Sequence, residues 1–571
     1  MNMKVTCDGH ALMDLPTWSL DMQTLKMVHA VEEGRHCSPQ PYGSSHETRA
    51  GKLNLKLIQN PTLQGYANPD QDANALKWMA AGCIIGVHHW REMFEPEEPE
   101  SKNESKMWYS QLVGPSLKDF GEGKWRAVVP VDNILCCPPW NATHVLRINT
   151  TDPEQLQIEA TGCDLGSGKG KWKSGVLGAD GNIYCPPWFA SRVLRIDPYV
   201  GTSELIGPEF TLPDPVKLAQ DFGDSIGDGD GDVSDESWGK WMDGTLAANG
   251  CLYCQPWCAS HVLKIDTRNG SVELIGPDLG WAPDKYRAAV VATDGVIYCP
   301  PHSARRVMKL EIATDTVSFV GPDYGTKPGK WWAGAMTLVN TIVCAPHSAG
   351  QVLQIDLFRQ MCTLVGRDFG SGEAKYRSIV QSNDGCFYCP PCNAPQVLCI
   401  DPLTPDADYV GPDLCCGGFK WVVAGLGEDG CVYSPPWLAH KSLRVDVPTR
   451  WARQIGKNQG WGGGKWEAMY PHEDGFFYCP PCCATDTLSL DTLIGTTELL
   501  TPELGKEPRK WRCTGRSAAG ELYCPPFEHD KVLRLTFKNL QLDSPSGTKD
   551  SPLSRASSRV QESRASSLLQ G

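Results

Sequence analysis

The chain has 571 residues, of which 41% are hydrophobic and 21% are charged. This composition is ordinary for a folded protein with a large core, and it excludes disorder as the main state. The formal net charge of -14 argues against non-specific binding to nucleic acid, which requires a basic surface. We therefore expect no nucleic-acid partner.

The first residues, MNMKVTCDGHALMDLPTW, contain no charged segment followed by an apolar one, so they predict no secretory signal. The best apolar stretch, residues 79–87, is far shorter than the roughly 18 residues of a membrane-spanning helix. We expect a cytoplasmic location and no membrane partner. The sequence makes no prediction of the oligomeric state.

In chain order, residues 1–76 are predicted to be an irregular or degenerate N-terminal region. A Lys-Trp pair at residue 77 lies 47 residues before Lys124, where the first clear repeat begins. Residues 77–123 are therefore interpreted as a degenerate repeat followed by a closing strand. This leaves open whether the region forms a tenth unit.

From Lys124 onward the chain repeats one pattern nine times, approximately a K-[W/Y] pair, then D-G-x-[I/L/F]-Y-C-P-P-[W/H/C]-x-A, then V-L-x-I-D. The last six intervals are 45 residues each, and such a fixed period indicates stacked copies of one structural unit. We call the lysines that begin the copies the frame lysines. They are Lys124, Lys171, Lys240, Lys285, Lys330, Lys375, Lys420, Lys465 and Lys510.

Each copy contains four short apolar runs, and Asp294-Gly295 illustrates the Asp-Gly pair that joins the first run to the second. Asp-Gly between apolar runs favours a β-hairpin, because the tight turn needs positive φ. Four antiparallel strands in about 45 residues have the size of a β-propeller blade, and the repeat has no helical periodicity. The sequence thus predicts an all-β fold, a β-propeller over residues 124–539. Nine repeats leave open eight to ten blades, or two smaller propellers.

The two ends of the repeat array also predict how the ring closes. The ninth copy stops after its third strand, at residues 532–537, whereas residues 108–115 resemble an isolated fourth strand. We expect these segments to pair, because pairing removes two exposed sheet edges.

An acidic insertion at residues 208–239 interrupts the array and contains nine acidic residues and one lysine. Its Asp-x-Asp-x-Asp spacing resembles a calcium-binding loop, although Val233 stands where an EF-hand needs glycine. A solvated acidic loop is the alternative, and no other cofactor is expected. The candidate ligands for this weak calcium site are Asp228, Asp230, Asp232, Asp235 and Glu236.

Residues 540–571 form a Ser-rich, Arg-containing tail that is predicted to be disordered. The 25 cysteines are an odd number, and eight of them recur at one position of the repeat. A residue that recurs in the middle of a strand pattern is predicted to be a small buried thiol, not half of a disulfide. These frame cysteines are Cys137, Cys185, Cys254, Cys299, Cys344, Cys389, Cys479 and Cys524.

Because strands alternate in direction, the Lys-Trp pairs and the C-P-P-x-x-A segments are predicted to share one rim of the disc. A ring of lysines there would bind an anion as point charges. The alternative is structural: Asp278 precedes Lys285 by seven residues, and most copies repeat this spacing, so a lysine–acid pair would join blades.

The residue after Pro-Pro varies while the repeat around it is kept, which is typical of a binding surface built on a scaffold. His302, His347 and Cys392 occupy it in successive copies and are also residue types that bind zinc, with packing as the alternative. The predicted partner-binding residues are Trp140, Trp188, Trp257, His302, His347 and Trp437, together with Lys285 and Lys330.

The order of strands in residues 175–197 and 288–312, with D-G-x-I-Y followed by V-L-x-I-D, resembles the NHL and streptogramin-lyase (virginiamycin B lyase-like) propeller repeats. The resemblance implies a propeller. None of the catalytic His and Glu positions of the lyases match this chain, so the resemblance implies no lyase activity. No H-E-x-x-H motif is present.

These observations favour a non-enzymatic scaffold that binds a protein or peptide partner through its Lys/Trp rim. The alternative is a propeller enzyme, a lyase or hydrolase that uses a divalent cation near the central channel. Fold alone does not decide between them.

Overall fold

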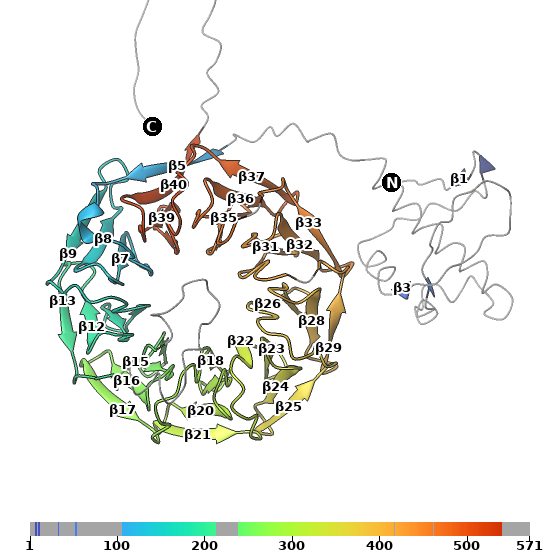
Figure 1. Ribbon diagram of the computed structural model, residues 1–571, viewed down its shortest axis with the longest axis horizontal. Helices are drawn as coiled ribbons and strands as arrows, with labels where there is room; N and C mark the ends of the chain where they lie inside the picture. The colour runs from blue at the N-terminus through green and yellow to red at the C-terminus, as the bar shows by residue number, and fades with distance from the viewer. Residues whose placement is uncertain are drawn as a thin grey trace, which may run out of the picture.

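The computed structural model describes residues 106–212, 238–415, 417–460 and 462–539, together with four two-residue strands nearer the N-terminus. Those strands form two pairs: β1 (Thr6–Cys7) with β2 (His10–Ala11), and β3 (Glu32–Glu33) with β4 (Lys52–Leu53). All other described strands belong to one closed ring of nine four-stranded antiparallel sheets (Figure 1). The predicted all-β propeller is confirmed.

Blades 1 to 4 each take their strands from consecutive sequence, and the first strand of each lies nearest the centre (Figure 1). Blade 1 is β6 (Val129–Val131), β7 (Ile134–Cys137), β8 (Val145–Asn149) and β9 (Gln157–Thr161). Blade 2 is β10 (Val176–Leu177), β11 (Ile183–Cys185), β12 (Val193–Ile196) and β13 (Ser203–Ile206). Blade 3 is β14 (Thr245–Leu246), β15 (Cys251–Cys254), β16 (Val262–Asp266) and β17 (Ser271–Ile275). Blade 4 is β18 (Val290–Val291), β19 (Ile297–Cys299), β20 (Val307–Glu311) and β21 (Thr316–Val320).

Blades 5 to 8 repeat this order. Blade 5 is β22 (Trp331–Met336), β23 (Thr341–Pro346), β24 (Val352–Asp356) and β25 (Met361–Val365). Blade 6 is β26 (Val380–Gln381), β27 (Phe387–Cys389), β28 (Val397–Asp401) and β29 (Asp406–Val410). Blade 7 is β30 (Gly425–Leu426), β31 (Val432–Ser434), β32 (Ser442–Asp446) and β33 (Trp451–Ile455). Blade 8 is β34 (Tyr470–Pro471), β35 (Phe476–Cys479), β36 (Thr487–Asp491) and β37 (Thr496–Leu500).

Blade 9 combines the two ends of the ring. Its first three strands are β38 (Gly515–Arg516), β39 (Leu522–Cys524) and β40 (Val532–Asn539), and its fourth is β5 (Lys106–Val113). All eight residues of β5 pair with β40 in antiparallel register (Figure 1). The closure expected from the repeat pattern is thereby confirmed, and a pair of smaller propellers is wrong.

Three sequence-based interpretations lie outside the described residues: a degenerate repeat before residue 106, the acidic insertion from residue 213 to 237, and the tail from residue 540. Among the described residues no helix is long and apolar enough to span a membrane. The only helical turn in this part of the chain is the short 3-10 segment η3 (Lys118–Phe120).

The aromatic residue after each frame lysine packs inside its blade and is hydrogen-bonded to the segment before the third strand. All nine of these rings are almost fully buried. In every blade the indole N–H or phenol O–H donates a hydrogen bond of 3.0–3.1 Å to the carbonyl of the residue just before the third strand. Tyr286 and Tyr376 keep this bond where tryptophan is replaced, because a phenol can also donate.

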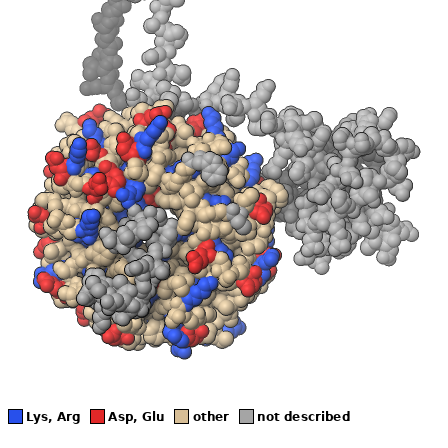
Figure 2. Space-filling view, viewed as in Figure 1, with Lys and Arg blue, Asp and Glu red and all other residues tan. Residues whose placement is uncertain are grey.

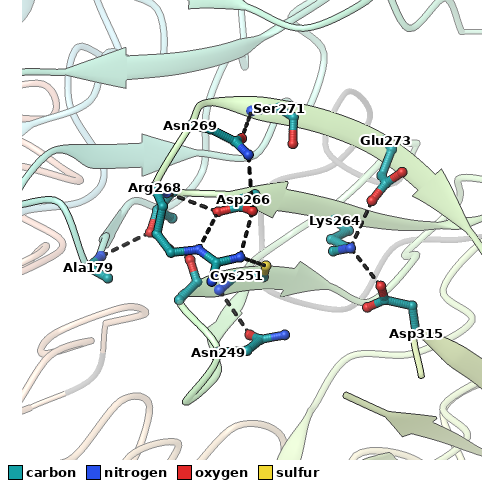
Figure 3. A network of polar contacts seen from close by, with 12 residues as sticks. Ala179, Asn249, Cys251, Lys264, Asp266, Arg268, Asn269, Ser271, Glu273 and Asp315 are labelled. Carbon is teal, nitrogen blue, oxygen red and sulfur yellow. Dashed lines mark hydrogen bonds and ion pairs between the residues drawn. The ribbon is translucent and has the colours of Figure 1, made fainter. Parts of the chain in front are cut away.

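Side chains also join neighbouring blades near their outer strands (Figure 3). Lys264 of blade 3 pairs with Asp315 of blade 4 at 2.6 Å and with Glu273 of its own blade at 2.8 Å. Asp315 also accepts a hydrogen bond of 2.6 Å from the hydroxyl of Tyr253. These polar contacts supplement the apolar clusters that fill the space between successive blades.

The eight frame cysteines are at most 1% exposed and lie in the second strands of their blades. All cysteines in the described part of the chain are free thiols. Burial raises the pKa of these thiols, for example that of Cys524 to about 12, because a thiolate loses its hydration there. The prediction that the frame cysteines are buried in the second strands is confirmed, and their reduced state stays a prediction.

Thiol labelling of the native protein is expected to modify Cys163 and Cys415, which are exposed, more than about tenfold faster than any frame cysteine. Peptide mass spectrometry after a short pulse of alkylating reagent measures this difference. In denaturant all positions should react alike. Native labelling of the frame cysteines at the rate of Cys163 would contradict their placement in the blade cores.

Candidate functional site

The frame lysines are part of the scaffold. Lys285 is 5% exposed, and its Nζ donates to the carbonyls of Cys258 (2.8 Å), Gly280 (3.1 Å) and Ala282 (2.9 Å). An ammonium group has three N–H donors, so these carbonyls use all of them. Lys330 is 3% exposed and donates to the carbonyls of Gly325 and Lys327. The structure places both residues inside the rim, and not on the surface where the sequence predicted a partner to bind them.

The same contact recurs around the ring. Eight of the nine frame lysines donate to the carbonyl three residues earlier, at 2.7–3.2 Å. Five of them also reach a carbonyl of the preceding blade and so join adjacent blades. Burial lowers the pKa of Lys285 to about 8.

The predicted lysine–acid pair is replaced by an indirect arrangement. Asp278 accepts a hydrogen bond of 2.8 Å from the N–H of Gly280, and the Gly280 carbonyl in turn accepts one from Lys285. The acid thus shapes the loop that holds the lysine. Asp323 and Asp368 make the equivalent bonds in the next two blades.

Main-chain hydrogen bonds close a second ring beneath the rim. In every blade the N–H of the frame lysine donates to the carbonyl of the residue after Pro-Pro in the preceding blade, as Lys285 does to Trp257 at 2.8 Å. The N–H of the residue after Pro-Pro donates back to the lysine carbonyl of its own blade, as His302 does to Lys285 at 3.0 Å. The bond from Lys124 to Phe527 joins the last blade to the first.

The variable residues after Pro-Pro form a buried layer. Eight of the nine are buried, and Trp437 is half-buried. Their rings contact one another from blade to blade: the centroids of Trp188 and Trp257 are 6.2 Å apart, those of Trp257 and His302 5.5 Å, and those of His302 and His347 5.9 Å. Most of the predicted partner-binding residues therefore pack against each other, as Trp140 also does.

His302 and His347 are the polar members of this layer. Their Nδ1 atoms lie 3.2 and 3.1 Å from the carbonyls of Asp284 and Gly329, which can only accept, so Nδ1 carries the proton. Burial lowers the pKa of both imidazoles, that of His347 to about 3. Within the described residues no group of three or more His, Cys, Asp or Glu side chains could hold a metal ion, so Cys392 does not complete a zinc site with them.

The buried neutral state of His347 predicts a specific acid sensitivity. In the unfolded chain the imidazole takes up a proton below its ordinary pKa of 6.5, whereas the folded protein does not until about pH 3. Its contribution to stability is therefore present above pH 6.5 and is lost as the pH falls. When the pH is lowered from 7.5 to 5, the free energy of unfolding of the wild type is expected to fall by about 2 kcal/mol more than that of His347→Phe. Urea unfolding at both pH values measures this; equal losses would contradict a neutral buried His347.

The side chains that face the channel come one position after the Lys-Trp or Lys-Tyr pair. In blades 2 to 6 these residues line a single pocket of about 390 Å³ on the channel wall, which we call the channel pocket. They are Lys173, Met242, Arg287, Trp332 and Arg377. Ser174, Asp243, Ala288, Ala333 and Gly334 complete the lining.

Aromatic rings hold the three cations of the channel pocket. The guanidinium carbons of Arg287 and Arg377 lie 3.4 and 4.3 Å from the centroid of the Trp332 ring, and Trp332 stacks on His347 at 4.7 Å. Nζ of Lys173 lies 4.5 Å from the centroid of a tryptophan ring in the layer below. Such cation–π contacts contribute about 0.5–2 kcal/mol each and restrict the rotamers of long side chains.

Among the described residues, basic side chains outnumber acidic ones in the lining of the channel pocket. Its lining contains three basic side chains and one acidic one, Asp243, whose pKa is raised because the surrounding protein removes part of its hydration. On the other side of the ring, Arg512 occupies the same repeat position and forms a two-point ion pair with Glu467 at 2.6 and 2.8 Å. On the face of the ring seen in Figure 2, basic and acidic groups are interspersed.

Sequence reasoning missed Arg287, Trp332 and Arg377. The available signal was their position in the repeat, directly after the Lys-Trp or Lys-Tyr pair. Across the nine blades this position holds arginine, lysine, methionine, tryptophan, valine or glutamate. The predicted calcium ligands, Asp228 to Glu236, lie outside the described residues, so calcium binding there stays a prediction.

No family model matches the chain, and no curated protein matches it. Solved structures with a similar fold include virginiamycin B lyase from Staphylococcus aureus, with 11% identity over 75% of this chain and 99% of that chain and a TM-score of 0.36. The computationally designed Ika8 protein has 10% identity over 74% and 100% of the two chains, with a TM-score of 0.41. The Dos1 propeller has 9% identity over 76% and 94%, with a TM-score of 0.39. At this low identity the similarity concerns the β-propeller fold alone.

Proposed function

We propose that the protein is a non-enzymatic β-propeller scaffold that binds an acidic segment of a protein or peptide partner in the channel pocket. The observation that supports this most is the group of Lys173, Arg287 and Arg377, held on aromatic rings along the wall formed by five successive blades. The frame lysines and tryptophans, which the sequence placed in this role, instead make the scaffold that presents the pocket.

Charge and rigidity both favour such a partner. Three basic side chains and one carboxylate in the described lining favour an acidic segment and raise its rate of association. Arginine and tryptophan are also the residues that most often contribute the binding energy of interfaces. Because Arg287 and Arg377 already contact the Trp332 ring, they lose less side-chain entropy on binding than mobile arginines would.

The enzymatic alternative, a lyase or hydrolase with a divalent cation, receives less support from this pocket. A divalent cation prefers several oxygen ligands, whereas Asp243 is the single carboxylate among three cationic side chains in the lining. His302 and His347 belong to the buried layer and do not line the pocket.

Partner capture by the immobilised full-length protein tests the proposal. Arg287→Glu/Arg377→Glu should lose at least about 90% of the captured acidic partner, because it reverses the charge of the pocket. The matched control is Arg305→Glu/Arg359→Glu, which makes the same charge change at exposed sites of blades 4 and 5 and should capture normally. Circular dichroism confirms that both variants fold. Undiminished capture by the pocket variant would overturn the proposed function.

A further inference from the structure

A pair of thiols lies where blade 6 meets blade 7, outside the lining of the channel pocket. Cys386 directly precedes β27 and shares a face with Tyr388, because side chains two residues apart in an extended chain point the same way. Tyr388 pairs with Cys399 of β28. The Cys386 thiol donates a hydrogen bond to the Cys399 sulfur, and each residue is 5% exposed. We propose that Cys386 and Cys399 are an oxidation site of this protein, where a hydroperoxide converts the two thiols into a reversible disulfide.

The place of Cys399 in the repeat sets this pair apart from the other cysteines. In six of the nine blades the residue at this place of the third strand is basic, and these residues are Arg147, Arg195, Lys264, Lys309, Arg444 and Arg534. In blade 6 the cation comes from the next blade instead, since Nη2 of Arg450 donates to the Cys386 sulfur at 3.7 Å. A guanidinium beside two thiols stabilises the thiolate, which is the form that reacts with oxidants.

Two other blades show what a single thiol does at the place of Cys386. Cys251 and Cys431 occupy it in blades 3 and 7, and each accepts a hydrogen bond from an arginine, at 3.9 and 3.3 Å. The third-strand residues at the place of Cys399 are Lys264 and Arg444 there, so these cysteines have no second thiol at that place. They are matched controls for the pair in blade 6.

The surroundings assign the two cysteines different roles. The hydrogen bond from Cys386 and the nearby charge of Arg450 lower the pKa of Cys399, although burial acts in the opposite direction. The same hydrogen bond raises the pKa of its donor, Cys386. Cys399 is therefore the attacking thiolate, and Cys386 is the thiol that resolves the first product. Asp384, the acidic neighbour, accepts hydrogen bonds from the Cys386 N–H and the Tyr388 hydroxyl, both at 2.9 Å.

The reaction has two steps. The Cys399 thiolate attacks one oxygen of the hydroperoxide, the O–O bond breaks, and a sulfenic acid forms while the other oxygen leaves as an alcohol or as water after protonation. Cys386 then gives up its proton and its sulfur attacks the Cys399 sulfur, so that an S–S bond forms and hydroxide leaves as water with that proton. Two thiols and one hydroperoxide thus yield one disulfide, one alcohol or water, and one further water.

The position of Cys386 allows both access and closure. Asp384 and Arg450, which flank the pair, are exposed, so a small hydroperoxide has one layer of side chains to pass. Diagonal neighbours in a sheet have Cα atoms about 7–8 Å apart, whereas a disulfide requires less than about 7 Å, so closure needs a shift of about 1 Å. Cys386 lies in the turn before β27, and a shift there leaves the pairs of β27 in place. A disulfide closed in this way is strained and therefore easily reduced.

Peptide mapping of the full-length protein without reduction, after brief exposure to hydrogen peroxide, tests the proposal. A cross-linked pair of peptides containing Cys386 and Cys399, lighter by two hydrogens, should form and should disappear with dithiothreitol. Under the same exposure Cys386 and Cys399 should lose their reactivity toward an alkylating reagent in denaturant at least about tenfold faster than Cys251 and Cys431.

Variants separate the two roles. Cys386→Ser removes the resolving thiol, so a sulfenic acid that dimedone traps should accumulate on Cys399, at least about fivefold above the wild type. Arg450→Met should slow formation of the disulfide at least about threefold, and Arg450→Lys should restore most of the rate. Cys431→Ser is the matched control and should leave the cross-link unchanged. Circular dichroism confirms that each variant folds.

The wild-type mapping decides the proposal even where a variant fails to fold. Two outcomes would overturn it: absence of the Cys386–Cys399 cross-link when exposed Cys163 is already oxidised, or oxidation of Cys251 and Cys431 as fast as that of the pair. Trapping of the sulfenic acid on Cys386 instead of Cys399, in Cys399→Ser but not in Cys386→Ser, would reject the assigned roles.

Discussion

Removal of residues 1–113 is expected to prevent the propeller from folding as a closed ring. These residues include β5, which pairs with β40 along its whole length and supplies the fourth strand of blade 9. Trp108 of β5 also packs on Tyr478 of blade 8, with ring centroids 4.4 Å apart. The lost strand hydrogen bonds and apolar burial amount to about 5–10 kcal/mol, which is comparable with the whole stability of a typical domain.

The matched control removes residues 1–105 and keeps β5. It is expected to give a monodisperse protein, because it keeps β5 and every other strand of the ring. The longer truncation leaves the edge of β40 unpaired and should aggregate. Size-exclusion chromatography and thermal unfolding compare the two. A folded, monomeric protein lacking residues 1–113 would contradict closure by β5.

Lys285→Met is expected to lower the free energy of unfolding by about 3–5 kcal/mol. The substitution removes one buried cation and leaves three converging carbonyls without their donor, and such orphaned groups cost more than the net value of the bonds. Methionine preserves most of the apolar stem, so the loss reports mainly on the polar contacts. Urea unfolding at pH 7 measures the change.

Lys309→Met on the same blade serves as the control. The Lys309 side chain is 16% exposed and forms one ion pair of 2.8 Å with Glu311, which is 41% exposed, so its loss should cost no more than about 1–2 kcal/mol. Equal effects of the two substitutions would contradict the role of the three carbonyl contacts of Lys285 in stability.

The sequence was sufficient for the architecture because the architecture depends on the repeat. A 45-residue period with Asp-Gly turns predicts four-stranded blades, and the incomplete ninth copy predicts that residues 108–115 complete it. The number of blades was less certain, because the Lys-Trp pair at residue 77 resembles the start of a further copy. Placing β5 in blade 9 gives nine blades.

The role of Lys285 depended on information that a sequence pattern does not contain. A lysine exposed on a rim and a lysine buried against carbonyls give the same sequence pattern. Which of the two occurs depends on the path of the loop that precedes the lysine. Asp278 was correctly linked to Lys285, but the link runs through the Gly280 carbonyl. A direct ion pair and this indirect contact require the same residues at the same spacing.

The channel pocket could not be predicted because residues of five different blades line it. Arg287, Trp332 and Arg377 lie 45 residues apart in sequence, and no local motif joins them. Their contact arises only when consecutive blades bring the same repeat position to one arc of the channel wall. The position after the Lys-Trp or Lys-Tyr pair varies from blade to blade, and this variation was the available signal. The prediction relied on the other variable position, after Pro-Pro, where the side chains are largely buried.

Hydrogen–deuterium exchange of the protein with and without its captured partner tests binding in the channel most directly. We expect slower exchange at the starts of the first strands of blades 2 to 6, because these segments line the pocket. The segments are residues 171–177, 240–246, 285–291, 330–336 and 375–381. Protection confined to the outer turns, such as residues 197–203 and 356–361, with unchanged exchange along the channel wall, would contradict it.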